Sequence, residues 1–144
     1  MVVVSERRPD RAFVHRLRVR YHEIDGQSHV YNARYLEYLD VAMVEFFREL
    51  GWGLDAALKA GFDPVLARVE MDFRMPARLD EILGVEVRPT RVGGASFDIS
   101  FAVRADHGDT VLEAAIAYVN FDTKARSARP VPAGIAAALR QACG

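Results

Sequence analysis

Residues 33–50 read ARYLEYLDVAMVEFFREL, and this stretch decides which folds the chain can adopt. Its apolar side chains recur every three or four residues, and charged side chains fill much of the opposite side. This spacing predicts an amphipathic α-helix. The apolar positions are Leu36, Leu39, Met43, Phe46 or Phe47, and Leu50. Asn32 is the expected N-cap and Gly51 the expected C′ residue, so we expect one long helix with defined ends.

Segments on both sides of this helix have the sequence pattern of β-strands. Residues 13–22 alternate between apolar and polar, which indicates a strand with one wet face. Four more strands are expected after a short second helix, and they span residues 67–75, 82–92, 97–104 and 111–121. The first of these four is expected to be half-buried. The last is apolar on both faces and is therefore expected to be central.

The turns between these strands predict how they are connected. Gly93-Gly94 is typical of a hairpin turn, and a second turn is expected at His107-Gly108-Asp109. A terminal helix is expected at residues 133–141. Only residues 33–50 are long and apolar enough to cover a sheet, so we predict an α+β fold in which five antiparallel strands wrap around one long helix. Such a sheet has free edges, and we expect a homodimer or homotetramer.

Composition excludes several classes of protein. The chain has 144 residues, of which 51% are hydrophobic and 27% charged, and its formal net charge is -1. It lacks the basic excess of a nucleic-acid-binding protein, and no segment approaches the ~20 apolar residues of a membrane span. The single cysteine, Cys143, excludes a disulfide framework. We expect one cytoplasmic domain covering residues 1–144, with no nucleic-acid or membrane partner.

The segment that leads into the long helix carries the candidate chemistry. Residues 21–38 read YHEIDGQSHVYNARYLEY, with Asp25 a few residues before the helix start. A helix N-terminus offers unpaired N–H groups and the positive end of a dipole, which hold a developing oxyanion well. A carboxylate beside them can attack a thioester or activate water. From the residues alone, the commoner interpretations are that Asp25 is a turn residue, His29 a solvated histidine and Asn32 a cap.

The same segment resembles a known family signature. Its register positions are Tyr21, Glu23, Asp25, His29, Val30, Asn32, Tyr35 and Leu36. This spacing is similar to that of the hotdog-fold acyl-CoA thioesterases of the 4-hydroxybenzoyl-CoA thioesterase type. The resemblance extends from about Arg18 to Pro132. One departure is Ser28, where many relatives have glycine, and another is the sequence Gly93-Gly94-Ala95, where the family has a basic cluster.

The resemblance implies a function and a set of site residues. It implies hydrolysis of a small or medium acyl-CoA, or of an aryl-CoA, without metal or cofactor. Asp25 would be the nucleophile or general base, and the Asn32 backbone N–H would polarise the thioester carbonyl. The acyl group would lie between subunits. The substrate-binding candidates are His29 and Tyr35, with Arg88, Arg91, Arg126 and Arg129 as contacts for the phosphates of CoA.

Three alternatives remain open from the sequence. A hotdog hydratase or dehydratase would need a histidine paired with an acidic residue, but His29 lies in the loop and no Gly-His-Phe-Pro-Gly-type run is present. A non-catalytic hotdog module would bind an acyl thioester without cleaving it, and the presence of Asp25 argues against this. An unrelated α+β binding protein would require the whole register to be coincidence.

Overall fold

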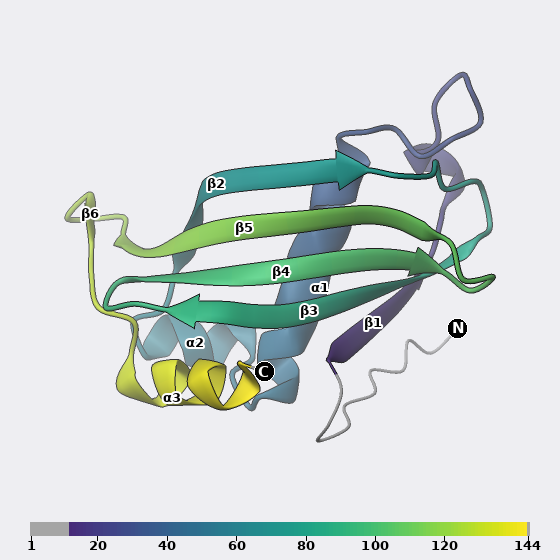
Figure 1. The fold of residues 1–144 in the computed structure, drawn as a ribbon. Coiled ribbons are helices and arrows are strands. Elements are labelled where there is room, and N and C mark those ends of the chain that lie inside the picture. Colours follow the sequence, from purple (N-terminus) through teal and green to yellow (C-terminus); the bar gives the residue numbers. More distant parts are fainter. Residues whose placement is uncertain (1–11, 144) are drawn as a thin grey trace.

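The computed structural model describes residues 12–143. Figure 1 shows a curved sheet with one long helix behind it. The helices are α1 (Arg34–Glu49), α2 (Leu54–Lys59) and α3 (Ala133–Ala142), and a 3-10 turn, η1, spans Tyr21–Glu23. The strands are β1 (Phe13–Arg18), β2 (Pro64–Phe73), β3 (Ile82–Val92), β4 (Ser96–Ala105), β5 (Thr110–Asp122) and β6 (Ser127–Ala128). The predicted elements are confirmed, although β1 ends earlier than expected because the chain turns into η1.

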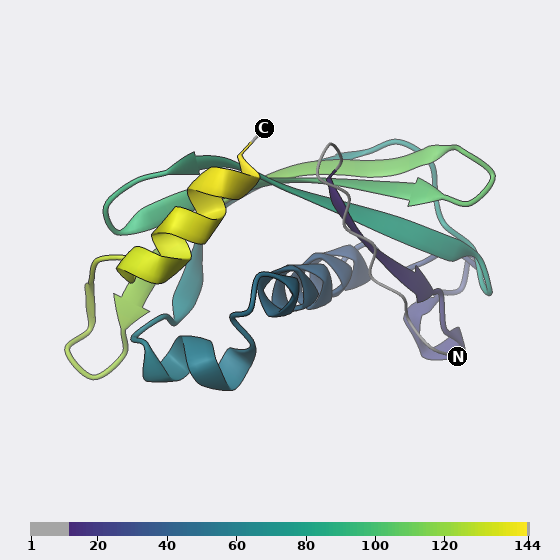
Figure 2. The same ribbon diagram turned by 90° about the horizontal axis from the view of Figure 1, so that it is seen from below.

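The sheet is antiparallel throughout, with the strand order β1-β3-β4-β5-β2. The short strand β6, which the sequence did not predict, pairs with the end of β5. Seen from below, the sheet curves around α1 (Figure 2). The prediction of five antiparallel strands wrapped around one helix is therefore confirmed, and β5 is central as expected, since it pairs with both β4 and β2. None of the helices among residues 12–143 is long and apolar enough to cross a membrane.

An aromatic cluster fixes the C-terminal half of α1 against the sheet. Phe47 of α1 lies 5.2 Å from Phe62, and Phe62 lies 5.6 Å from Phe97 of β4, measured between ring centroids. Phe97 in turn stacks on Tyr118 of β5 at 5.1 Å. Burying one such ring stabilises the fold by about 1.5–3 kcal/mol. This packing sets the position of α1 and so fixes where its N-terminal end lies.

The two ends of α1 differ from each other, and one of them differs from the prediction. Gly51 has a φ of 90°, the left-handed conformation expected at the C′ position. At the other end the N-cap is Ala33, without a side-chain cap hydrogen bond. The prediction of an Asn32 cap is wrong, because residues 31–33 form a tight turn in which Arg34 N–H donates to the Tyr31 carbonyl at 2.8 Å.

Strand β2 also departs from the prediction. It was expected to be half-buried, yet its apolar side chains are largely exposed: Val69 is 38% exposed and Phe73 53% exposed. The reason is position, since β2 pairs with β5 on one side and is the last strand of the sheet on the other. A long, apolar edge strand of this kind is a ready template for pairing with another strand.

Candidate active site

The loop before α1 folds back on itself as a small hairpin. Asp25 N–H donates to the His29 carbonyl at 2.8 Å, and Ser28 N–H donates to the Asp25 carbonyl at 3.0 Å. A bridge between Ile24 and Val30 closes the base of the hairpin. Ser28 has a φ of 64°, a conformation that glycine adopts most readily. The left-handed backbone therefore gives a physical reason to expect glycine at this position.

Two contacts hold the hairpin against the loop between β2 and β3. Val30 N–H donates to the Ala77 carbonyl at 2.9 Å, and Ala77 N–H donates to the Tyr35 hydroxyl at 3.1 Å. A further bridge joins His29 to Arg78. Tyr35 is only 3% exposed, so it supports the loop from the core. That Tyr35 contacts the substrate stays a prediction, and the burial of its side chain argues against it.

Glu23 anchors the other side of the hairpin, a role that the sequence did not reveal. Its Oε1 accepts hydrogen bonds from the Tyr38 hydroxyl at 2.8 Å and from Arg20 N–H at 2.7 Å. Its carbonyl accepts from Tyr31 N–H at 2.9 Å. Burial, and then the bond to Glu23, raise the pKa of the Tyr38 phenol, which therefore remains a neutral donor. The sequence indicated Glu23 only as a position of the family motif, and motif spacing alone does not show which group a carboxylate contacts.

One of the two carboxylate oxygens of Asp25 accepts a hydrogen bond within the described residues, and the other does not. Its Oδ1 accepts from Gln27 N–H at 2.8 Å, which is the local turn contact that the commoner interpretation of this residue expects. Its Oδ2 accepts no hydrogen bond from residues 12–143. The side chain is half-buried. Burial, followed by the charges of Glu81 and Asp25, raises the pKa of Tyr35, so the Asp25 carboxylate acts electrostatically on a tyrosine in the first turn of α1.

The start of α1 presents free backbone donors. Neither Asn32 nor Ala33 donates its N–H to an acceptor within the described part of the chain. Both precede Arg34, the first residue of the helix, where the helix dipole is positive. The hairpin and the helix start thus bring together a half-buried carboxylate with an open oxygen and amide groups suited to a carbonyl oxygen.

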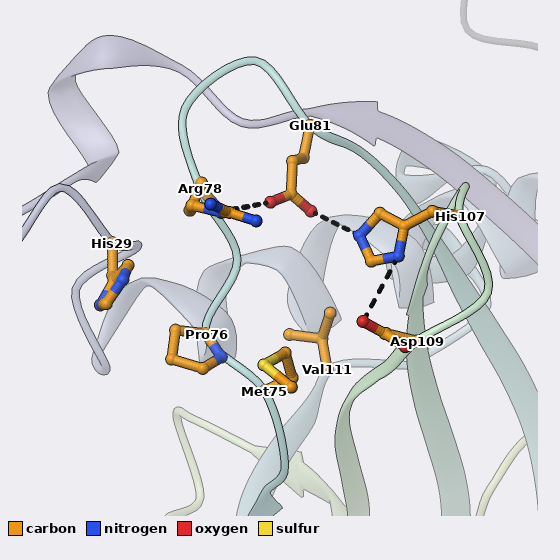
Figure 3. A pocket seen from close by; sticks show the side chains of 8 residues that line it. All are labelled: His29, Met75, Pro76, Arg78, Glu81, His107, Asp109 and Val111. Atoms are coloured by element: carbon orange, nitrogen blue, oxygen red, sulfur yellow. Dashed lines mark hydrogen bonds and ion pairs between the residues drawn. The ribbon is translucent and has the colours of Figure 1, made fainter.

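A cavity of about 250 Å³ adjoins the hairpin (Figure 3). His29 lines it on one side, and Met75, Pro76 and Val111 contribute apolar surface. On the far side, His107 lies 3.4 Å from both Glu81 and Asp109, and Glu81 also pairs with Arg78 at 3.3 Å. The sequence predicted only a turn around His107. No local pattern indicated this cluster, because its members come from two distant loops.

The β3–β4 turn and β6 lie at the other end of the sheet from the hairpin (Figure 1). Of the four arginines predicted to contact phosphates, Arg91 is next to that turn and Arg126 and Arg129 flank β6, whereas Arg88 lies in the middle of β3, opposite Ser100. Arg91 is committed to Asp98 at 2.9 Å and to Ser96 at 2.9 Å. Arg129 is half-buried and lies 3.9 Å from Asp122. Arg88 and Arg126 are exposed and make no hydrogen bond or ion pair with any other residue in the range 12–143. One protomer therefore does not bring these arginines to Asp25.

The fold and the arrangement at the start of α1 define the class of protein as a hotdog-fold thioester hydrolase, in agreement with the resemblance. The family model of the thioesterase-like superfamily matches residues 19–139, and the chain belongs to this family.

Individual relatives agree with this assignment. The acyl-CoA thioester hydrolase YbgC of Escherichia coli O6:H1 is 27% identical over 127 residues, which cover 87% of this chain and 93% of that protein. The long-chain acyl-CoA thioesterase FadM of Escherichia coli K12 is 29% identical over 116 residues, covering 78% and 85% of the two chains. The structure of a thioesterase superfamily protein from Jannaschia sp. CCS1 superposes with a TM-score of 0.85 at 25% identity, covering 98% of this chain and 99% of that chain.

Proposed function

We propose that the protein hydrolyses acyl-CoA thioesters at the start of α1, with Asp25 as the reacting carboxylate. The observation that carries this proposal is the pairing of an open Asp25 oxygen with the unpaired amides of Asn32 and Ala33 on one braced turn. The names of the relatives YbgC and FadM support an acyl-CoA as the substrate.

The chemistry follows from charge development. The thioester carbonyl oxygen accepts a hydrogen bond from the Asn32 N–H and becomes an oxyanion as the carbon turns tetrahedral. In one route the Asp25 carboxylate attacks that carbon and expels the CoA thiolate, and water then hydrolyses the mixed anhydride. In the other, Asp25 takes a proton from water as the water attacks. Both routes release a carboxylic acid and CoA. Removal of one oxyanion donor typically lowers kcat by about 10²–10³.

The exposed edge of β2 supports a dimer in which two copies pair antiparallel through this strand. A two-fold axis perpendicular to the sheet pairs residues of the same face. If the axis passes through Val69, Arg68 lies opposite the partner's Glu70. If the axis instead passes through Arg68 or through Glu70, that residue lies opposite its own copy in the partner, and like charges face each other. Opposite charges across a ladder are favourable and like charges are not. The register centred on Val69 is therefore the one that we propose.

This register also completes the site. It brings the Pro64 end of the partner's β2 beside the Phe73 end of this strand, which is the end that touches Tyr35 at 5.8 Å. The β5–β6 turn lies beside the start of β2, so the partner's Arg126 approaches the hairpin that carries Asp25. Arg126 is exposed and uncommitted, and we therefore favour it among the four arginines as a contact for the CoA phosphates.

Thiol release from a panel of acyl-CoA and aryl-CoA thioesters tests the proposed function. We expect wild type to release CoA, and Asp25→Asn to lower kcat/KM by at least about 100-fold because the amide is a poor nucleophile and base. Asp80→Asn is the matched control, since Asp80 has a φ of 70°, which asparagine tolerates, and lies in a neighbouring loop.

Three results would contradict the proposal at different levels. If wild type binds the thioesters but releases no thiol from any of them, the enzyme is not a thioesterase. If it instead adds water to an enoyl thioester without thiol release, a hydratase is the correct class. Full activity of Asp25→Asn would leave the hydrolase intact and overturn only the site.

A further inference from the structure

Glu23 lies between the two groups that the proposed reaction needs, which are the Asp25 carboxylate and the unpaired amides at the start of α1. Along the chain, Glu23 precedes Asp25 by two residues. Across the hairpin, its carbonyl accepts a hydrogen bond from Tyr31 N–H at 2.9 Å, and Tyr31 directly precedes Asn32. One residue therefore connects both arms of the hairpin close to the reacting groups.

The side chain of Glu23 ties this connection to the body of α1. Its Oε1 accepts hydrogen bonds from the Tyr38 hydroxyl at 2.8 Å and from Arg20 N–H at 2.7 Å. Tyr38 lies in the second turn of α1, where its side chain is 4% exposed and its ring centroid lies 5.9 Å from that of Tyr35. The core therefore holds the hydroxyl in place, and the hydroxyl in turn holds the carboxylate of the hairpin.

The same contacts make the Glu23 carboxylate poorly suited to react. Its side chain is 15% exposed, and one of its oxygens already accepts two hydrogen bonds. Its other oxygen lies 3.9 Å from the imidazole of the exposed His22. Asp25, by contrast, has an oxygen that accepts no hydrogen bond from residues 12–143. The two neighbouring carboxylates are therefore suited to different tasks.

We propose that Glu23 is a positioning residue, which holds the Asp25 carboxylate at a fixed distance and angle from the amides at the start of α1. This inference rests on the proposed function. A displacement of about 1 Å at a reacting group can lower a rate by about 100-fold. Since the amides stabilise charge that develops in the transition state, a shift of the hairpin lowers kcat and leaves KM nearly unchanged.

Substitutions of Glu23 separate positioning from chemistry, with the acyl-CoA of the panel that wild type hydrolyses fastest as the substrate. Glu23→Ala removes the acceptor, and we expect kcat to fall by about 10-fold to 100-fold while KM stays within about threefold. Glu23→Gln keeps an oxygen that can accept from the Tyr38 hydroxyl, so it should retain at least about a third of the wild-type kcat. Glu37→Ala is the matched control and should keep the wild-type kcat, because Glu37 directs its exposed carboxylate to Arg34 instead.

Tyr38→Phe tests whether the buried hydroxyl acts through Glu23. This variant keeps the ring in the core and removes only the donor. We expect its kcat to fall by about threefold to tenfold. Because both changes break the same contact, Glu23→Ala combined with Tyr38→Phe should be no slower than Glu23→Ala alone. Losses that multiply would show that the two residues act independently, and the proposal would be wrong.

Amide hydrogen exchange gives a measurement that does not depend on turnover. Tyr31 N–H donates to the Glu23 carbonyl, so its exchange reports whether the hairpin keeps its place. Measured by NMR relative to the amides of β5, this exchange should be at least about tenfold faster in Glu23→Ala than in wild type or Glu37→Ala. Urea unfolding shows whether the variants fold. Should Glu23→Ala fail to fold, the kinetics and the Tyr31 exchange of Tyr38→Phe decide in its place.

The outcomes separate positioning from the activity itself. If Glu23→Gln folds but loses as much kcat as Glu23→Ala, the charge of the carboxylate is required and Glu23 takes part in the chemistry. A raised KM at unchanged kcat, or an unchanged exchange rate of Tyr31, also contradicts the proposal. Absence of thiol release by wild type would instead contradict the proposed function, and the exchange of Tyr31 would then still decide whether Glu23 holds the hairpin.

Discussion

At the scale of single residues, Ser28 and His15 each occupy an environment that their residue type does not favour. Ser28 holds a left-handed backbone at the tip of the hairpin that carries Asp25, and its exposed side chain contributes no hydrogen bond within residues 12–143. His15 of β1 is 5% exposed, and its Nδ1 is buried without a partner among the described residues. Both residues offer direct tests of how the fold supports the site.

Ser28 provides a test of the geometry of the hairpin. A left-handed conformation costs a residue with a side chain roughly 1–2 kcal/mol, while glycine adopts it freely but loses about 0.5–1 kcal/mol of extra entropy on folding. We therefore expect Ser28→Gly to stabilise the protein by up to about 1 kcal/mol, and Ser28→Val to destabilise it by about 1–3 kcal/mol. Urea unfolding measures both, and thiol release shows whether Asp25 keeps its place. Equal stability of Ser28→Val and wild type would contradict this view of the turn.

His15 gives a prediction for pH dependence. Burial lowers the pKa of this imidazole from its usual 6.5, an effect that the charge of Glu45 only partly offsets. The folded protein therefore binds this proton less readily than the unfolded chain does. The contribution of the neutral imidazole to stability is complete above pH 6.5, and it falls as the pH decreases through that value.

The measurement is the free energy of unfolding of wild type and His15→Phe between about pH 8 and pH 5. Wild type should lose more stability on acidification than His15→Phe. His22→Gln, at an exposed histidine, is the control for the general effect of removing a histidine. Parallel curves for wild type and His15→Phe would show that His15 is protonated equally in both states.

At the scale of elements, the periodicity of apolar residues predicted most of the helices and strands but not which of their side chains are exposed to solvent. The spacing of Leu39 and Phe46 predicted α1 because a buried helix face has to repeat every three to four residues. The same reasoning failed for β2, since alternation shows which residues are apolar and not whether another element covers them. Val69 and Phe73 are exposed in the protomer, and no strand among residues 12–143 pairs with the free edge of β2.

The sequence predicted those parts of the candidate site whose residues are close together in the chain. Asp25 and the helix start are close in sequence, so a short loop has to keep them together. The brace of Glu23 on Tyr38 and that of Tyr35 on Ala77 connect residues 15 and 42 positions apart, and local patterns carry no information about such contacts. The cap at Asn32 was mispredicted because the loop geometry, which the residue types do not determine, shifts the helix start to Arg34.

At the scale of the whole molecule, the proposed dimer would account for both the exposed strand β2 and the distance between Arg126 and Asp25. A protomer alone leaves apolar side chains of β2 exposed, and its β5–β6 turn, which carries Arg126, lies at the other end of the sheet from the start of α1 (Figure 1). Antiparallel pairing through β2 would cover these side chains and shorten the distance from Arg126 to Asp25. In the proposed dimer, each site would combine the helix start of one copy with the strand start of the other, so we expect activity to depend on dimerisation.

The register of this dimer is testable by exchanging charges. In the proposed pairing, Arg68 faces the partner's Glu70 twice across the two-fold axis, so Arg68→Glu replaces two attractive pairs with two repulsive ones. At about 0.2–1 kcal/mol for each attractive pair lost and a similar penalty for each repulsive pair gained, the dimer should weaken by roughly fourfold to several hundredfold. Adding Glu70→Arg restores both pairs in reversed order and should restore the affinity. Glu113→Arg, on the exposed face of the neighbouring strand β5, is the control and should leave the dimer unchanged.

Dissociation constants from analytical ultracentrifugation decide between the outcomes, and thiol release on dilution should fall at the same protein concentration as the dimer. If the double variant is as weak as Arg68→Glu, the two strands pair in another register; if all variants remain monomeric like wild type, β2 does not form the interface.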